Sequence, residues 1–98
     1  MTEKATLPLS RLREIGWHFW DPIGLLPEGA DWKTQTFIDE YDVYLLHVAF
    51  SLQAGWSAEL AIAYLVQAEV EAMGLGLRST TKDRAVSTVT ALRTALRL

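Results

Sequence analysis

The sequence predicts an all-α fold, a single small domain that resembles a four-helix bundle. Three observations support this prediction. Apolar residues recur at helical spacing in four separate segments of the chain. Glycine, proline or capping residues stand between those segments, and no segment shows a strand or hairpin pattern. A chain of 98 residues, half of them hydrophobic, suffices for one core, so we expect one domain over 1–98 with a flexible arm over 1–7.

The first predicted helix covers 9–20. Pro8 suits the start of a helix, because its missing amide hydrogen is not needed there. The apolar residues at helical spacing are Leu9, Leu12, Ile15 and Phe19. Pro22 disfavours helical geometry in the preceding residue, so we expect the helix to stop before Asp21.

The second predicted helix covers 36–54 and ends at Gly55. Its apolar stripe consists of Phe37, Tyr41, Tyr44, Leu45, Val48 and Leu52. Val43, Leu46 and Phe50 fall outside the stripe, so this helix is apolar around most of its circumference. Such a helix is either central in its fold or part of an oligomer interface.

The last two predicted helices follow in quick succession. The third begins after Ser57, a good N-cap residue, and ends at Gly74. The fourth begins near 79–81 and carries a stripe of Ala85, Val86, Val89, Leu92 and Leu96. Its β-branched composition gives it the weakest intrinsic helix propensity of the four, so we expect its stability to depend on docking.

The segment between the first two predicted helices, about 21–35, is long for a helical protein of this size. Its apolar residues predict a loop packed over one end of the bundle; they are Ile23, Leu25, Leu26 and Trp32. Asp21-Pro22-Ile23-Gly24 has the residues of a type I turn. In one interpretation this corner is structural: Asp21 binds nearby backbone amides and Trp20 fills the core. In the other, the loop is a lid or docks a partner.

Four tryptophans flank the predicted helix ends or the loop, namely Trp17, Trp20, Trp32 and Trp56. We expect them to build a second, smaller aromatic cluster at the end of the bundle. Such side chains bury large areas and anchor either cores or interfaces.

An acidic run, Asp39-Glu40-Tyr41-Asp42, opens the second predicted helix. One interpretation is a charged helix start that the helix dipole favours. The alternatives are a recognition face for a basic partner and a divalent cation site, although the ligand spacing of a cation loop is missing. The corner, the loop and this run supply the candidate binding residues: Trp20, Asp21, Ile23, Leu25, Leu26, Trp32, Asp39, Glu40 and Asp42.

Charge and composition narrow the function further. The net charge of −3 divides into an acidic body over 15–75 and a basic segment over 76–98. We expect no nucleic acid partner, because the acidic body repels phosphate. No apolar run reaches the roughly 18 residues of a membrane span, so we expect no membrane association. The chain has no cysteine and shows no signal peptide pattern, so we expect a cytoplasmic protein.

Catalytic motifs are missing from the sequence. His18 and His47 do not have the spacing of metal ligands, and we expect both to be partly buried on helices. The serines form no nucleophile elbow, and no glycine loop follows a strand. We therefore predict no catalytic residue, metal or cofactor. The alternative is a small-molecule- or metal-dependent enzyme in which both histidines meet Asp39 and Asp42.

Three short motifs, WDPIG over 20–24, DEYD over 39–42 and MGL over 73–75, resemble those of a group of short bacterial helical proteins of unknown function. The resemblance covers about 17–75, and its motifs are moderately specific only together. It implies a small helical fold and no catalytic residues. Some members of the group look like immunity-type or accessory binding proteins. In this chain the interval between Gly24 and Asp39 is longer than the resemblance implies.

Together these observations favour a non-catalytic interaction module, accessory or immunity-like. The expected partner is another protein or a second copy of the chain, so a homodimer is one possible form. The acidic second helix and the apolar loop are the expected contact regions.

Overall fold

The computed structural model describes residues 7–98, which form four α-helices and no strand. The helices are α1 (Leu9–Ile15), α2 (Asp42–Gln53), α3 (Ala58–Gln67) and α4 (Thr81–Leu96). One π-helical turn extends α1 over Gly16–Trp20, and another extends α3 over Ala68–Ala72. A short 3₁₀ turn occupies Trp32–Thr34 in the loop. The predicted all-α class is confirmed.

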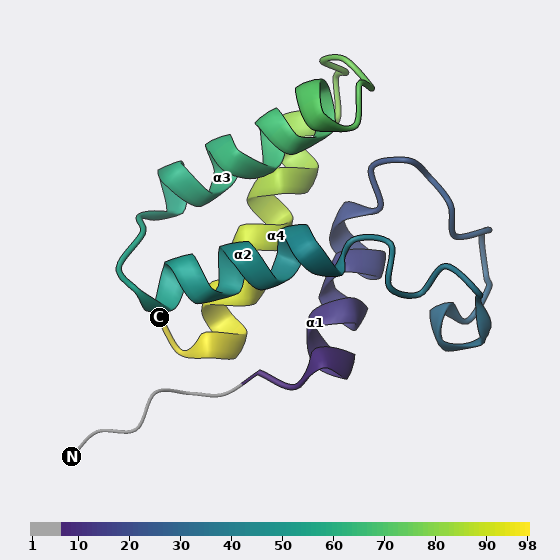
Figure 1. Ribbon diagram of the computed structural model, residues 1–98, viewed down its shortest axis with the longest axis horizontal. Helices are drawn as coiled ribbons and strands as arrows, with labels where there is room; N and C mark the ends of the chain where they lie inside the picture. Colours follow the sequence, from purple (N-terminus) through teal and green to yellow (C-terminus); the bar gives the residue numbers. More distant parts are fainter. Residues whose placement is uncertain (1–6) are drawn as a thin grey trace.

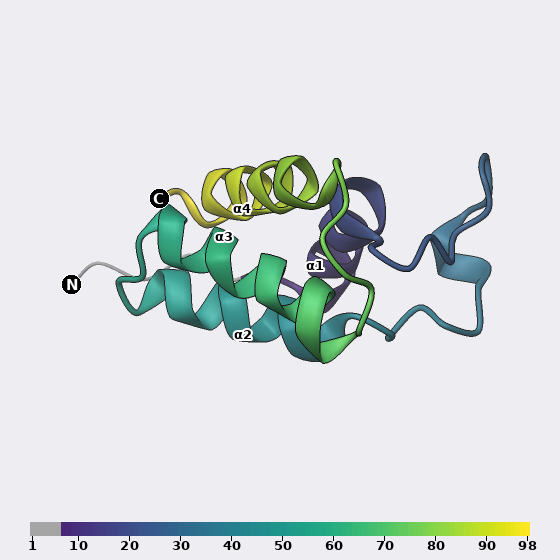
Figure 2. The same cartoon turned by 90° about the horizontal axis from the view of Figure 1, so that it is seen from above.

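The helices surround one core (Figure 1). Helices α2 and α3 form an antiparallel pair joined by a short turn, and α4 crosses behind this pair (Figure 1). Seen from above, α4 and α2 lie on opposite sides of the molecule, and α1 lies at the end from which the long loop extends (Figure 2). Every helix therefore has one side on the core and one side outward.

The core draws large side chains from all four helices. Its fully buried members include Leu12, Ile15, Trp20, Tyr41, Leu45, Val48, Leu65, Val89 and Leu92. An added Cβ at Gly16 would meet the end of the Leu45 side chain, so a glycine at this position favours the close approach of the first helix to α2. Of the predicted stripe of α4, Ala85, Val89, Leu92 and Leu96 are buried in this shared core, whereas Val86 is exposed. Docking through the four buried residues offsets the weak intrinsic propensity of the helix.

Three predicted helices match the structure closely, whereas the second begins later than predicted. The chain over 36–41 forms turns, and α2 starts at Asp42. The reason lies in a tertiary contact: Trp17 Nε1 donates to the Ile38 carbonyl at 3.1 Å. In a helix that carbonyl would accept from the Asp42 amide, which instead bonds to the Asp39 carbonyl at 3.1 Å.

The long loop meets the core at only part of its length. Leu25, Leu26 and Trp32 are partly buried and pack against the core, but Ile23 is exposed. The middle of the loop extends beyond the helices in both views (Figures 1 and 2). The predicted arm over 1–7 lies outside the described residues except for Leu7, which is partly buried against the core.

The four tryptophans do not share one aromatic cluster, contrary to the prediction. Trp17 and Trp20 both pack on Tyr41, with ring centroids 4.8 and 5.3 Å away. Trp56 belongs to a separate group with His47 and Tyr64 at the other end of α2. Trp32 lies in the loop, where the Lys33 ammonium is 5.8 Å from the ring centroid.

Candidate functional site

The corner after the first helix is held by the carboxylate of Asp21. Its oxygens accept hydrogen bonds from the amides of Leu25 and Leu26 at 3.0 and 3.1 Å. The Tyr41 hydroxyl donates to the same carboxylate at 2.8 Å and accepts from the Ile23 amide at 3.2 Å. Burial raises the pKa of Tyr41, and the bond to Asp21 raises it further, so the hydroxyl remains a donor. The structural interpretation of this corner is confirmed.

The turn that was predicted at the corner forms, but Asp21 has an unusual backbone. The Gly24 amide donates to the Asp21 carbonyl at 3.0 Å, which closes the turn. Asp21 itself has φ of 30°, in the left-handed region that few residues other than glycine, asparagine and aspartate adopt. Trp20 is 1% exposed, and its indole nitrogen has no acceptor among the described residues. The ring therefore contributes through packing.

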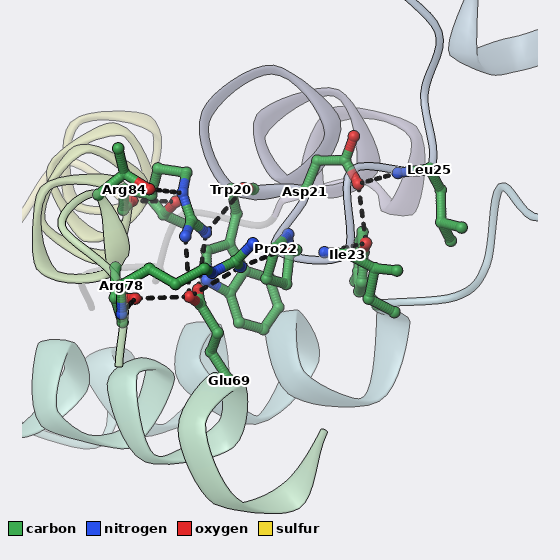
Figure 3. A network of polar contacts seen from close by, with 12 residues as sticks. Trp20, Asp21, Pro22, Ile23, Leu25, Glu69, Arg78 and Arg84 are labelled. Carbon is green, nitrogen blue, oxygen red and sulfur yellow. Dashed lines mark hydrogen bonds and ion pairs between the residues drawn. The ribbon is translucent and has the colours of Figure 1, made fainter. Parts of the chain in front are cut away.

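A second polar site lies behind the corner and centres on Glu69, a carboxylate that is 0% exposed (Figure 3). Arg84 donates to both of its oxygens, at 2.6 and 2.8 Å. The Thr81 hydroxyl donates at 2.7 Å and Arg78 at 3.0 Å. We call this group of four residues the Glu69 junction. Every oxygen of the buried carboxylate is hydrogen-bonded, as a buried charge requires.

The Glu69 junction also holds the corner in place. Arg84 donates to the Trp20 carbonyl at 3.4 Å, and Arg78 donates to the carbonyl of Pro22 (Figure 3). The two arginines thus join the carboxylate to the backbone of the turn. The basic charge of 76–98 is used, at these two positions, within the chain itself.

The electrostatics of the junction favour the ionised carboxylate. Burial alone would raise the pKa of Glu69, because desolvation penalises charge. Hydrogen bonds from Arg84, Thr81 and Arg78 outweigh burial and lower the pKa to about 2. Glu69 is therefore charged at neutral pH, and both of its oxygens accept hydrogen bonds from within the chain.

Sequence reasoning missed the Glu69 junction, although a signal for it exists. Glu69 lies four residues after Leu65 and eight after Ala61, both fully buried, and so on the buried face of its helix. An acid on an apolar face needs a cationic partner. The basic fourth helix was the available source.

The acidic run does not form one continuous face. Asp42 is partly buried and accepts three hydrogen bonds from Arg13, at 3.0, 3.2 and 2.7 Å. These hydrogen bonds raise the pKa of Arg13. Asp39 and Glu40 are exposed in turns before the helix, so the prediction that all three carboxylates lie in its first turns is wrong.

The two histidines are exposed, contrary to the prediction that both are partly buried. His18 lies against Phe19, and His47 lies between Trp56 and Tyr64 with ring centroids 5.4 and 4.6 Å away. Within residues 7–98, no group of three or more histidine, aspartate or glutamate side chains could hold a metal ion. The structure therefore does not assemble the residues of the alternative enzyme hypothesis into a metal site.

Two surface hollows accompany these sites. One, of about 470 Å³, lies between the first helix and the loop; its walls include Trp17, Phe19, Leu26 and Trp32, and Arg11 and Glu14 also line it. The other, also about 470 Å³, lies between α2 and α3; it is lined by Tyr44, Tyr64, Gln67, Ala68, Glu71 and Ala72. Leu26 and Trp32 are the only predicted binding residues that line either hollow. His18 also lines the first hollow, beside Arg11 and Glu14.

The most unusual surface lies on α2. Val43 and Phe50 are 75% and 68% exposed, and Leu46 is 37% exposed. With His47 they follow the spacing i, i+3, i+4 and i+7, which places them on one side of the helix. We call these four residues the outer face of α2. It continues through His47 into the rings of Trp56 and Tyr64. None of these positions was among the predicted binding residues, although the all-round apolar helix pointed to them.

Comparisons of the chain with protein-family models, with curated proteins and with solved structures find no match. The resemblance carried by WDPIG, DEYD and MGL stays a prediction. Over the described residues, no helix has both the length and the apolar composition that crossing a bilayer requires.

Proposed function

We propose that the protein is a non-catalytic interaction module that binds another protein through the outer face of α2. One observation carries this proposal: three large apolar side chains on one side of α2, Val43, Leu46 and Phe50, are exposed to solvent. Contiguous apolar surface of a few hundred Å² on a monomer marks an interaction site.

The outer face has no part in the core, which strengthens the proposal. The opposite side of α2 supplies the buried residues Leu45, Val48 and Leu52. The helix would fold onto the core equally well with polar residues at Val43 and Phe50. An apolar choice at these positions costs solubility, and a partner that covers them offsets that cost.

The corner and the Glu69 junction have a supporting role in this proposal. Trp20 and Asp21 fix the start of the loop, and Arg13 fixes the start of α2 through Asp42. Exposed Ile23 and the partly buried Leu26 and Trp32 form a smaller secondary surface. We propose a cytoplasmic accessory or immunity-like role, which the lack of cysteine supports.

A pull-down with matched variants tests the proposal. The baits are the unaltered chain, Phe50→Glu on the outer face, and Thr90→Glu at an exposed position of α4. We expect a protein that the unaltered chain and Thr90→Glu retain and Phe50→Glu loses. That protein, once purified, should bind the chain directly. Equal retention by all three folded baits would contradict the proposal.

A further inference from the structure

We infer that the partner of the outer face of α2 is a second copy of the same chain, bound so that the two α2 helices run antiparallel. The inference rests on the proposed function and names the partner of the same surface. Two features support it: the order of side-chain sizes along the face and the position of the acidic residues.

The side chains of the outer face are complementary to their own reversed order. Val43 is small and Phe50 is large, and they stand at equal distances from the midpoint between Leu46 and His47. A two-fold axis through that midpoint places Val43 of one copy against Phe50 of the other, and Leu46 against His47. A two-fold interface requires this kind of self-complementarity. The flanking rings of Trp56 and Tyr64 would widen the contact.

The charges favour the antiparallel arrangement over the parallel one. Asp39, Glu40 and Asp42 cluster at the N-terminal end of α2, whereas no charged residue occurs from Val43 to Ala58. A parallel pair would bring the carboxylates of both copies together, which is destabilising. In the antiparallel pair each acidic end lies beside the uncharged end of the other helix, and the helix dipoles oppose each other.

The small number of exposed side chains predicts a weak dimer. A stable interface buries about 800 Å² on each partner and involves roughly 20 to 30 residues a side. The outer face presents four side chains, of which Leu46 is only 37% exposed, so we expect a reversible dimer with a dissociation constant on the order of 100 µM.

Sedimentation analysis of the full chain tests self-association over concentrations of about 10 µM to 1 mM. We expect reversible dimers for the unaltered chain and for Thr90→Glu. Phe50→Glu should raise the dissociation constant roughly tenfold or more, because each copy loses its largest contact residue. A dimer that Phe50→Glu leaves unchanged would overturn the inference, as would a monomer throughout the range.

Introduced cysteines test the direction, and the absence of natural cysteine makes the result specific. Across the proposed axis, Leu46→Cys lies next to its own copy, so the single variant should form a disulfide-linked dimer. Phe50→Cys lies about 10 Å along the axis from its copy, beyond the reach of a disulfide. It should cross-link only when mixed with Val43→Cys. Ready cross-linking of Phe50→Cys alone would overturn the antiparallel geometry.

The two proposals fail separately. A monomer in sedimentation, combined with a purified protein that binds the unaltered chain and not Phe50→Glu, removes the self-association and keeps the interaction module. If the chain is monomeric in sedimentation and the folded baits retain no protein that depends on Phe50, both the self-association and the interaction module are ruled out.

Discussion

Two regions of this molecule reverse the usual placement of polar and apolar groups. At the Glu69 junction a carboxylate is fully buried, and on the outer face of α2 a phenylalanine is 68% exposed. The buried carboxylate has its partners: two arginines and a threonine satisfy it. No residue in the described part of the chain covers the exposed ring of Phe50 and shields it from water. The buried carboxylate is satisfied by contacts within the chain, whereas the exposed phenylalanine suggests a contact with another molecule.

The two regions contribute to different properties of the protein, namely stability and binding. Interactions closed within one chain contribute to the free energy of unfolding, whereas a surface that awaits a partner contributes to binding. Substitutions in the Glu69 junction should therefore lower stability, and substitutions on the outer face should not.

The largest effect is expected for Arg84→Met, which keeps the aliphatic stem and removes the charge. Glu69 then stays buried with only Arg78 and Thr81, and the free energy of unfolding should fall by about 3 kcal/mol. Urea unfolding measures the loss. Lys82→Met, at an exposed position two residues earlier, is the matched control and should change little. Equal stability of the two variants would show that the junction is dispensable.

A double variant sharpens this result. Glu69→Leu combined with Arg84→Met removes both charges, so that no carboxylate is left buried without its main partner. The double variant should regain most of the stability that Arg84→Met loses, since apolar pairs often replace buried ion pairs without loss. A double variant less stable than Arg84→Met would mean that the charges contribute beyond satisfying each other.

Acid should weaken the Glu69 junction in a defined pH window. The pKa of Glu69 is lowered in the folded protein from its ordinary 4.5 to about 2. A lowered pKa means that the folded state binds the proton less tightly, so the contribution is complete above pH 4.5 and declines as the pH falls toward 2. Its size is on the order of 3 kcal/mol.

Urea midpoints measured between pH 7 and pH 2 test this dependence. The unaltered chain should lose stability through that window more steeply than Glu69→Gln, which has no carboxylate at this position. Parallel curves for the two proteins would assign the acid sensitivity to other groups.

A smaller effect is expected at the corner, from Tyr41→Phe. The variant keeps the ring against Trp17 and Trp20 but removes the hydroxyl that bonds to Asp21 and to the Ile23 amide. The expected loss is about 1 kcal/mol, typical of a hydrogen bond between protein groups. Tyr64→Phe is the control in urea unfolding, because the Tyr64 hydroxyl makes no hydrogen bond to residues 7–98. A loss of stability no larger than that of Tyr64→Phe would show that the corner does not depend on the hydrogen bonds of the Tyr41 hydroxyl.

The smallest effect on stability is expected for Phe50→Ser. Measured at concentrations where the chain is monomeric, its free energy of unfolding should stay within about 0.5 kcal/mol of the unaltered chain. Leu45→Ser, on the buried side of the same helix, should be strongly destabilising. A large loss in the free energy of unfolding for Phe50→Ser would show that the outer face contributes to the core, which contradicts the comparison.

Much of the fold could be predicted because it follows from local patterns. The stops at Asp21 and Gly74, the Ser57 cap and the helical spacing all act within a few residues, and each is seen in the structure. The start of α2 could not be predicted in this way. It depends on Trp17, which lies 21 residues before Ile38. The indole of Trp17 donates a hydrogen bond to the Ile38 carbonyl, which a longer helix would use for its own backbone.

The sites were harder to predict than the helices. The role of Asp21 could be predicted, since two amides that donate hydrogen bonds to its carboxylate lie in the next five residues. The partners of Glu69 come from 9 to 15 residues along the chain, and only the fold sets which arginine reaches it. His47 was expected to be partly buried because it lies just off the apolar stripe of its helix. Periodicity alone does not say which side of a helix that is apolar all round faces water.

The contacts of Arg78 and Arg84 with the turn also bear on the order of folding. They join residues that are 56 and 64 positions apart, to the Pro22 and Trp20 carbonyls respectively. During synthesis the first helix and its turn emerge well before either guanidinium exists. Closing such large loops costs chain entropy, so we expect these contacts to form late. On this expectation the corner reaches its final geometry when Arg78 and Arg84 contact it, and the last helix completes a site that the first helix begins.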